Sequence, residues 1–80
     1  MYSIYILECM DGSLYTGITT DVARRLQEHI AGTASRYTRA RKAKRMVYTE
    51  TVMNRSAALK REAAIKKMPL EKKRSLFESY

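Results

Sequence analysis

Two short apolar runs joined by an aspartate–glycine turn constrain this chain more than any other feature of its sequence. Residues 2–9 and 13–19 are each long enough for a strand, and both are rich in residues that favour extended structure. The intervening Met10-Asp11-Gly12 is typical of a hairpin. Apolar side chains fall on both faces of residues 2–9, so we expect this strand to be covered on both sides.

The length of the turn decides the register of the hairpin. A two-residue Asp11-Gly12 loop would pair Met10 with Ser13, whereas a three-residue loop would pair Cys9 with Ser13. The longer loop is a type I turn closed by Gly12 in the left-handed region. We predict the three-residue loop.

The register in turn decides whether Tyr5 and Tyr15 share a face of the sheet. They lie on opposite faces in the two-residue register and on the same face in the three-residue register. In the predicted register Leu7 lies opposite Tyr15, and Tyr5 lies opposite Gly17. A glycine inside a strand is typical of a bulge, or of a place where a tyrosine or a phosphate approaches closely, and both interpretations stay open here.

A helix is predicted after the hairpin, running through about Ile30 and closed by Gly32. Its candidate N-caps are Thr19, Thr20 and Asp21. Its core face is expected to carry Val22, Leu26 and Ile30, which recur at four-residue spacing. Arg25 and His29 are also four apart, so their side chains should share one stripe beside that face.

A loop and a third strand are expected next. Residues 33–45 show no periodic apolar face, so we expect an ordered or semi-ordered loop there. Residues 46–52 are rich in strand-forming residues and predict the strand.

Two further helices are predicted in the last third of the chain. Asn54 or Ser56 caps the first, which runs to about Lys67. Its inner side is expected to carry Ala58, Leu59, Glu62, Ile65 and Met68. Pro69 occupies the first position of the second helix, whose expected anchors are Leu70, Leu76 and Phe77.

The element order β-β-α-β-α-α predicts an α+β fold, in which helices flank a three-stranded, mainly antiparallel sheet. Eighty residues leave room for one hydrophobic core, so residues 1–80 are expected to form a single domain.

Charge and composition narrow the function classes. A net charge of +8 favours a polyanionic partner, most often nucleic acid, over a membrane surface or a ribosomal contact. Cys9 is the single cysteine, which excludes a zinc knuckle and fits a reducing cytoplasm. The N-terminus lacks a basic region, and no apolar run approaches the roughly 20 residues that cross a bilayer. We therefore expect neither a signal peptide nor a membrane partner.

Residues 36–45 are the candidate nucleic-acid-binding segment. The basic residues are Arg36, Arg39, Arg41, Lys42, Lys44 and Arg45, and Tyr37 lies among them. Basic side chains with an interleaved aromatic ring are typical of segments that follow a phosphate backbone, and such binding weakens steeply with salt. A merely solvated loop is the alternative.

Four residues in the first thirty could act on a phosphodiester. Tyr5 and Tyr15 taken singly are ordinary strand residues, but a tyrosine beside a positive charge can act as a general base or orient water. Arg25 could bind a phosphate bidentately and offset charge in a pentacovalent transition state. His29, the single histidine, could hydrogen-bond a tyrosine or a leaving oxygen, although a structural role is the alternative.

Glu62 lies on the predicted inner side of its helix, where a carboxylate is normally avoided. An ion pair with Lys66, four residues along, is the simpler explanation. The other is a Mg²⁺ ion held by one carboxylate, waters and substrate phosphate. No second acid is positioned with Glu62, so a two-metal site is not expected.

These residues together resemble a known family. Ser3-Ile4-Tyr5 and Tyr15-Thr16-Gly17, followed by Arg25, His29 and Glu62, are similar to the motifs of the GIY-YIG nuclease domain. The chain resembles more narrowly the small stand-alone GIY-YIG proteins of bacteria, in which stretches like residues 37–39 and 58–62 recur. The resemblance extends over essentially the whole chain.

The resemblance implies the α+β fold described above and hydrolysis of DNA phosphodiesters with one Mg²⁺ or Mn²⁺ ion. It implies that Glu62 is the metal ligand and that Arg25 stabilises the transition state. It also implies that Tyr5 and Tyr15 position or deprotonate the attacking water and that His29 supports a tyrosine. DNA repair or recombination is the process it suggests. Which tyrosine is the base stays open.

The chain departs from the family pattern at three places. Ser3 replaces the first motif glycine, and Thr16 replaces an isoleucine. Many family nucleases carry an asparagine after the glutamate, whereas the single asparagine here, Asn54, precedes Glu62. The alternative function is therefore a nucleic-acid-binding module with weak or absent catalysis.

Overall fold

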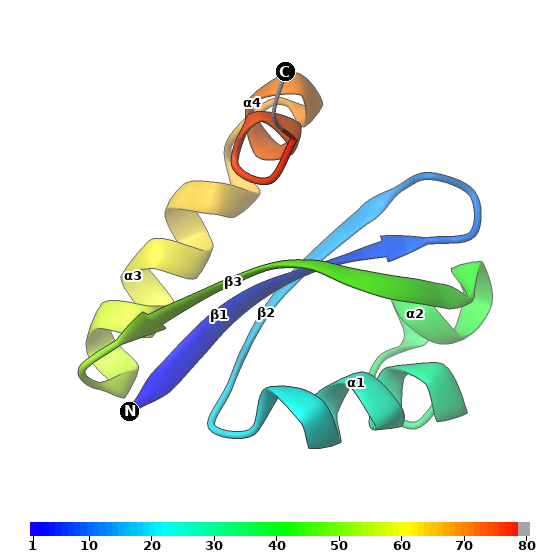
Figure 1. The fold of residues 1–80 in the computed structure, drawn as a ribbon, viewed down its shortest axis with the longest axis horizontal. Helices are drawn as coiled ribbons and strands as arrows, with labels where there is room; N and C mark the ends of the chain where they lie inside the picture. Colours follow the sequence, from blue (N-terminus) through cyan, green and yellow to red (C-terminus); the bar gives the residue numbers. More distant parts are fainter. Residues whose placement is uncertain (79–80) are drawn as a thin grey trace.

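The helices of this protein pack on a three-stranded antiparallel sheet (Figure 1). The computed structural model describes residues 1–78. Strand β1 (Tyr2–Cys9) is central, and β2 (Leu14–Thr19) and β3 (Ala43–Val52) pair with it from either side. The predicted α+β class is confirmed, with one short helix more than the sequence indicated.

The β1–β2 turn has the predicted three-residue loop. The Cys9 amide donates to the Ser13 carbonyl at 2.9 Å, and the Gly12 amide donates to the Cys9 carbonyl at 2.9 Å. Gly12 has a φ of 84°, which favours glycine because a side chain there is strained. Tyr5 consequently pairs with Gly17, as expected.

Helices cover both faces of the central strand, which explains why it is apolar on both sides. From Ile4 to Leu7 its side chains are almost completely buried. Ile4 and Ile6 face α3 (Arg55–Lys66) and pack against Ala58 and Ile65. The opposite face, which carries Tyr5, is covered by α1 (Val22–Ala31) and α2 (Arg36–Arg41) (Figure 1).

Helix α1 begins and ends where its sequence predicts, but it presents a different face to the sheet. Asp21 caps it by accepting the Arg24 amide at 3.0 Å, and Gly32 ends it at a φ of 80°. The prediction that Ile30 belongs to the core is wrong, because Ile30 is 54% exposed. His29 occupies the buried position next to it.

The prediction of a loop over residues 33–45 is also wrong. Ser35 caps α2 by accepting the Thr38 amide at 3.1 Å, and β3 begins at Ala43 rather than at residue 46. Helix α2 has six residues and buries only Thr38 among them, so it lacks the apolar periodicity that identifies longer helices.

Helix α3 confirms Asn54 as its cap, and its buried side chains are Ala58 and Ile65. Leu59 does not belong to the core, because it points outward and is exposed. The α3 surface toward the sheet is narrow, since its two fully buried residues are seven positions apart.

Helix α4 (Leu70–Ser75) follows Pro69, which occupies the N-cap position rather than the first helical position. Leu70 is exposed and does not anchor the helix as predicted. Leu76 and Phe77 do pack against the core. Among residues 1–78, no helix combines the length and apolarity needed to cross a bilayer.

Candidate active site

A hollow of about 220 Å³ lies at the free edge of β2 and draws its lining from both sides of the sheet. It is lined by Tyr5, Tyr15, Gly17, Ile18, Arg25, His29, Ala34 and Glu62. All five residues predicted to act chemically are in this group, although they span 58 positions of the sequence. The sheet register and two helices, α1 and α3, bring them together.

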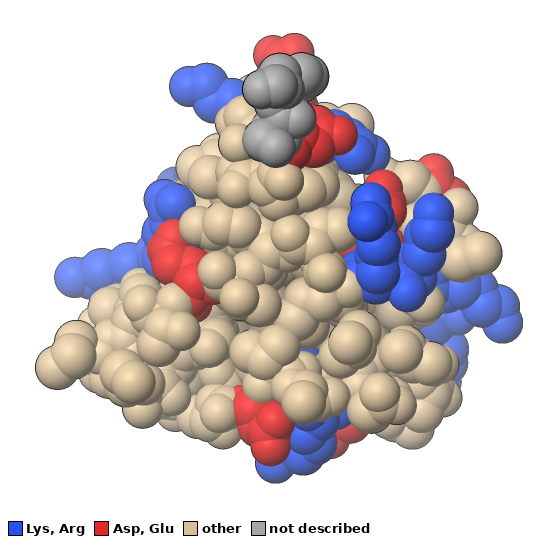
Figure 2. All heavy atoms as spheres, in the orientation of Figure 1, with Lys and Arg blue, Asp and Glu red and all other residues tan. Residues whose placement is uncertain are grey.

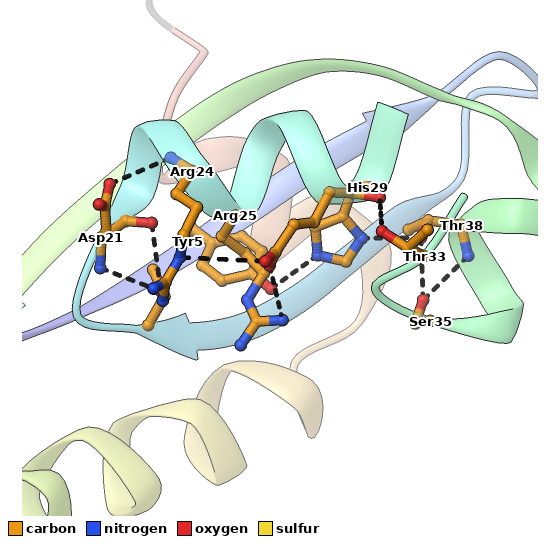
Figure 3. Close-up of polar contacts among 10 residues, drawn as sticks. Tyr5, Asp21, Arg24, Arg25, His29, Thr33, Ser35 and Thr38 are labelled. Atoms are coloured by element: carbon orange, nitrogen blue, oxygen red, sulfur yellow. Dashed lines mark hydrogen bonds and ion pairs between the residues drawn. The ribbon is translucent and has the colours of Figure 1, made fainter. Parts of the chain in front are cut away.

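Three aromatic rings form one wall of the hollow. The ring centroids of Tyr5 and Tyr15 are 6.5 Å apart, so the two tyrosines share a face of the sheet, as predicted. The His29 ring lies edge-on to both, at 5.6 Å from Tyr5 and 5.1 Å from Tyr15. The hydroxyl of Tyr5 is 2.8 Å from Nε2 of His29 (Figure 3).

Gly17 is required by close approach rather than by a bulge. The pairing of β1 with β2 is continuous through Tyr5 and Gly17. A Cβ at position 17 would lie 2.6 Å from Cζ of Tyr5 and closer still to its hydroxyl. The absent side chain therefore makes room for the end of the tyrosine at the hollow.

Burial keeps both members of the Tyr5–His29 pair neutral. Burial raises the pKa of Tyr5 strongly, the nearby Tyr15 raises it further, and Arg25 opposes the shift. Burial lowers the pKa of His29, and Arg25 lowers it further against the opposing effect of Glu28. At neutral pH the site thus contains a phenol hydrogen-bonded to an uncharged imidazole.

The second ring nitrogen of His29 also has a hydrogen-bond partner, on a residue that the sequence did not mark as functional. Its Nδ1 is 2.7 Å from Oγ1 of Thr38, and that hydroxyl is 2.9 Å from Oγ of Ser35. Thr38 is completely buried. The available signal was Ser35 itself, because serine is one of the residues favoured at a helix N-cap.

Arg25 points into the hollow from α1 (Figure 3). Its Nη1 lies 3.1 Å from Oε1 of Glu28, and its side chain is 33% exposed. Its Nε is buried and has no hydrogen-bond partner within residues 1–78. The guanidinium is thus oriented by Glu28 and partly exposed, so its accessible N–H groups can bind an oxyanion.

Glu62 approaches the same hollow from α3. Its side chain is 18% exposed, and its Oε2 is 3.5 Å from Nζ of Lys66, so the simple ion pair is present as well. No group of three or more histidine, cysteine or acidic residues suited to a metal occurs in the described chain. A lone carboxylate facing an open hollow fits Mg²⁺, which usually keeps waters and takes few protein ligands.

Tyr37 and Arg41 of the basic segment lie beside the active-site rings. The ring of Tyr37 is 5.7 Å from that of Tyr15, and the Arg41 guanidinium carbon is 4.5 Å from the centre of the Tyr37 ring. Arg41 also donates from Nη1 to Oδ2 of Asp11 at 2.8 Å. These contacts hold the basic segment against the hairpin.

The other predicted nucleic-acid-binding residues are spread over the neighbouring surface. Arg36 and Arg39 line a hollow of about 600 Å³ beside the turn between α1 and α2, and Lys42 lines a smaller one. Lys44 is exposed on β3, and Arg45 donates to Glu8 at 2.9 Å. Figure 2 shows lysine and arginine side chains grouped toward both edges of one face, with an area of uncharged residues between them.

A model of the GIY-YIG catalytic domain matches residues 1–74. The chain belongs to the GIY-YIG family. This membership confirms the resemblance read from the motifs and places the chain among nuclease domains, which generally act on nucleic acid with a divalent metal.

Several UPF0213 proteins share much of this sequence. The chain is 49% identical to the UPF0213 protein of Desulfotalea psychrophila, over 95% of this chain and 70% of that one. It is 53% identical to the UPF0213 protein of Haloquadratum walsbyi, over 94% and 84% of the two chains.

Two structures determined by NMR in solution share the fold. The UPF0213 protein of Bacillus halodurans is 43% identical, with a TM-score of 0.59 over 95% of this chain and 82% of that one. The protein EF2693 of E. faecalis is 42% identical, with a TM-score of 0.62 over 99% and 90%.

Proposed function

We propose that this GIY-YIG protein is a divalent-metal-dependent endonuclease that hydrolyses DNA phosphodiester bonds. The observation that supports it best is the convergence of Tyr5, Tyr15, Arg25, His29 and Glu62 on one hollow at the edge of the sheet. Each of these side chains has an ordinary structural explanation alone, but such explanations do not account for five of them lining the same surface.

In the proposed reaction each of these side chains has a distinct task. The scissile phosphate binds at Arg25, whose guanidinium offsets the charge that develops on the nonbridging oxygens. A water molecule between the tyrosine hydroxyls attacks phosphorus, the bond from phosphorus to the leaving oxygen of the DNA strand breaks, and solvent protonates that oxygen. Tyr5 takes the proton of this water while its own phenolic proton moves to Nε2 of His29 at 2.8 Å, so the charges balance. Glu62 would hold a divalent cation, which would supply Lewis-acid stabilisation of the phosphate.

Tyr15 has a supporting task in this scheme. The ring of Tyr15 neighbours the rings of Tyr5 and His29, and the ring of Tyr37 lies 5.7 Å from it. Tyr15 therefore orients the water and fixes the rings, whereas Tyr5 is the tyrosine with a proton acceptor in hydrogen-bonding distance.

The substrate is recognised by structure or with weak sequence specificity. A net charge of +8 favours contacts to the phosphate backbone, which position nucleic acid without reading bases. We propose that residues 1–80 act as one domain in the cytoplasm, in DNA repair or recombination.

The test is cleavage of branched, damaged and single-stranded DNA in the presence of Mg²⁺ or Mn²⁺. Glu62→Gln and Arg25→Ala should each lower the rate by about 10²–10³. Glu71→Gln, which neutralises an exposed carboxylate on α4, is the matched control and should cleave like the wild type. Equal cleavage by all four proteins would identify the activity as a contaminant.

A nucleic-acid-binding module without turnover is the second candidate. It is supported by the Glu62–Lys66 ion pair and by the lack of an asparagine within residues 63–80. This candidate predicts salt-sensitive DNA or RNA binding that Glu62→Gln leaves unchanged, with no metal-dependent cleavage by the wild type.

A further inference from the structure

Four polar groups form a continuous chain that begins at the hollow with Tyr5 and ends at the partly buried Ser35 (Figure 3). The Tyr5 hydroxyl is 2.8 Å from Nε2 of His29, and Nδ1 of the same ring is 2.7 Å from Oγ1 of Thr38. Oγ1 of Thr38 is in turn 2.9 Å from Oγ of Ser35. Tyr5, His29 and Thr38 are almost completely buried, so water does not compete for these contacts.

The tautomer of His29 links the direction of the hydrogen bond to Tyr5 with that of the hydrogen bond to Thr38. A neutral imidazole has one N–H donor and one bare nitrogen acceptor, and each hydroxyl has one proton. If Tyr5 donates to Nε2, then Nδ1 carries the ring proton and donates to Thr38, whose own proton can go to Ser35. If Nε2 carries the proton, every donor in the chain is reversed.

Donor and acceptor strength favour the first direction. A phenol is a stronger acid than a neutral imidazole N–H, and a bare imidazole nitrogen is a better acceptor than a phenolic oxygen. The Tyr5–His29 contact is therefore strongest as O–H···Nε2. Thr38 can serve this arrangement because its hydroxyl proton has a separate acceptor in Ser35.

We propose that Thr38 is a positioning residue that holds His29 in the tautomer protonated at Nδ1, leaving Nε2 free to take the Tyr5 proton. Its catalytic consequence rests on the proposed nuclease function, whereas the tautomer is a property of the resting protein. Helix α2 supplies the Thr38 hydroxyl. Ser35 caps this helix by accepting the Thr38 amide and also hydrogen-bonds the Thr38 side chain.

The tautomer can be read directly, because the chain contains one histidine. Two-bond ¹H–¹⁵N correlation spectra of the uniformly labelled protein at pH 8 distinguish the protonated ring nitrogen from the bare one. The wild type should show a protonated Nδ1. A protonated Nε2 in the wild type would overturn the proposal without any substitution being needed.

Substitution then separates positioning from packing. Thr38→Val keeps the shape but removes the acceptor, so the ring should lose its exclusive Nδ1 protonation, and kcat should fall about 100-fold with KM unchanged. Thr38→Ser restores the hydroxyl and should restore both readouts. Thr51→Val, at an exposed position on β3, is the matched control and should change neither.

The two proposals fail separately. Exclusive Nδ1 protonation and full kcat in Thr38→Val would contradict the role of Thr38. Failure of the wild type to cleave any DNA would contradict the nuclease function, and the wild-type spectrum would still decide which nitrogen carries the proton.

Discussion

The ring of Tyr5 occupies the space that a side chain at Gly17 would need. The two residues face each other across β1 and β2, and a Cβ at position 17 would meet Cζ of Tyr5 at 2.6 Å. Because Tyr5 is also tied to His29, the ring cannot move aside without breaking its hydrogen bond. Tyr5, the proposed base, can therefore keep its position only because Gly17 has no side chain.

Gly17→Ala should therefore reduce both stability and cleavage. Overpacking of this kind costs about 1–3 kcal/mol, measured as a lower urea midpoint. Gly12→Ala is the control, because a Cβ at that position meets open space and the φ of 84° alone costs about 1–2 kcal/mol. Gly12→Ala should lose stability and keep its cleavage rate. Loss of stability without loss of cleavage in Gly17→Ala would show that Tyr5 is not held by this contact.

His29 should make stability depend on pH in the mildly acidic range. Its pKa is lower in the folded protein than the ordinary 6.5, so the unfolded chain binds the proton more tightly. The contribution to stability is complete above pH 6.5 and is lost as the pH falls through the folded pKa. Unfolding free energies from urea titrations between pH 8 and pH 5 should therefore decline.

His29→Gln lacks this titration and should show a flatter profile over the same range. Two acidic groups titrate lower and do not confuse the comparison. Asp11 has its pKa held at about 2 by Ser13 and Arg41, and Arg45 lowers the pKa of Glu8. Parallel profiles for wild type and His29→Gln would show that the imidazole is not perturbed in the fold.

Much of this site could be predicted because strand register is a strong constraint. Once the turn had three residues, Tyr5 and Tyr15 had to share a face and Tyr5 had to meet Gly17. Arg25 and His29 joined them because residues four apart on a helix share a stripe. Glu62 was a candidate because a carboxylate is normally avoided on the inner side of a helix, and the family resemblance implies that it is the metal ligand.

The parts that could not be predicted depend on tertiary contacts. His29 is buried and Ile30 is exposed, because two hydrogen bonds offset the cost of burying the imidazole ring. A prediction based on hydrophobicity alone does not include these hydrogen bonds. Helix α2 could not be predicted from an apolar pattern, because its buried residue is Thr38, whose hydroxyl hydrogen-bonds His29.

Arg36 and Arg39 should contribute to nucleic-acid affinity mainly through phosphate contacts. They line the large hollow beside α2, and no ion pair involving them occurs within residues 1–78. Each substitution to alanine should reduce the slope of log K against log salt by about 1, measured by fluorescence anisotropy with single- and double-stranded DNA. Lys72→Ala, on the exposed side of α4, is the control and should leave the slope unchanged. An unaltered slope in both arginine variants would remove this segment from the binding surface.

Ile65 and Ile30 provide a direct comparison of a correct and an incorrect core prediction. Ile65 is completely buried against Ile4 and Ile6, so Ile65→Ala should destabilise the protein by about 2–5 kcal/mol in urea unfolding. Ile30 is mostly exposed, and Ile30→Ala should change the unfolding free energy by no more than about 0.5 kcal/mol. Since both are helical isoleucines, propensity effects nearly cancel and the difference reports burial. A similar loss for both variants would mean that α1 packs through Ile30, and the orientation that brings His29 to Tyr5 would then be wrong.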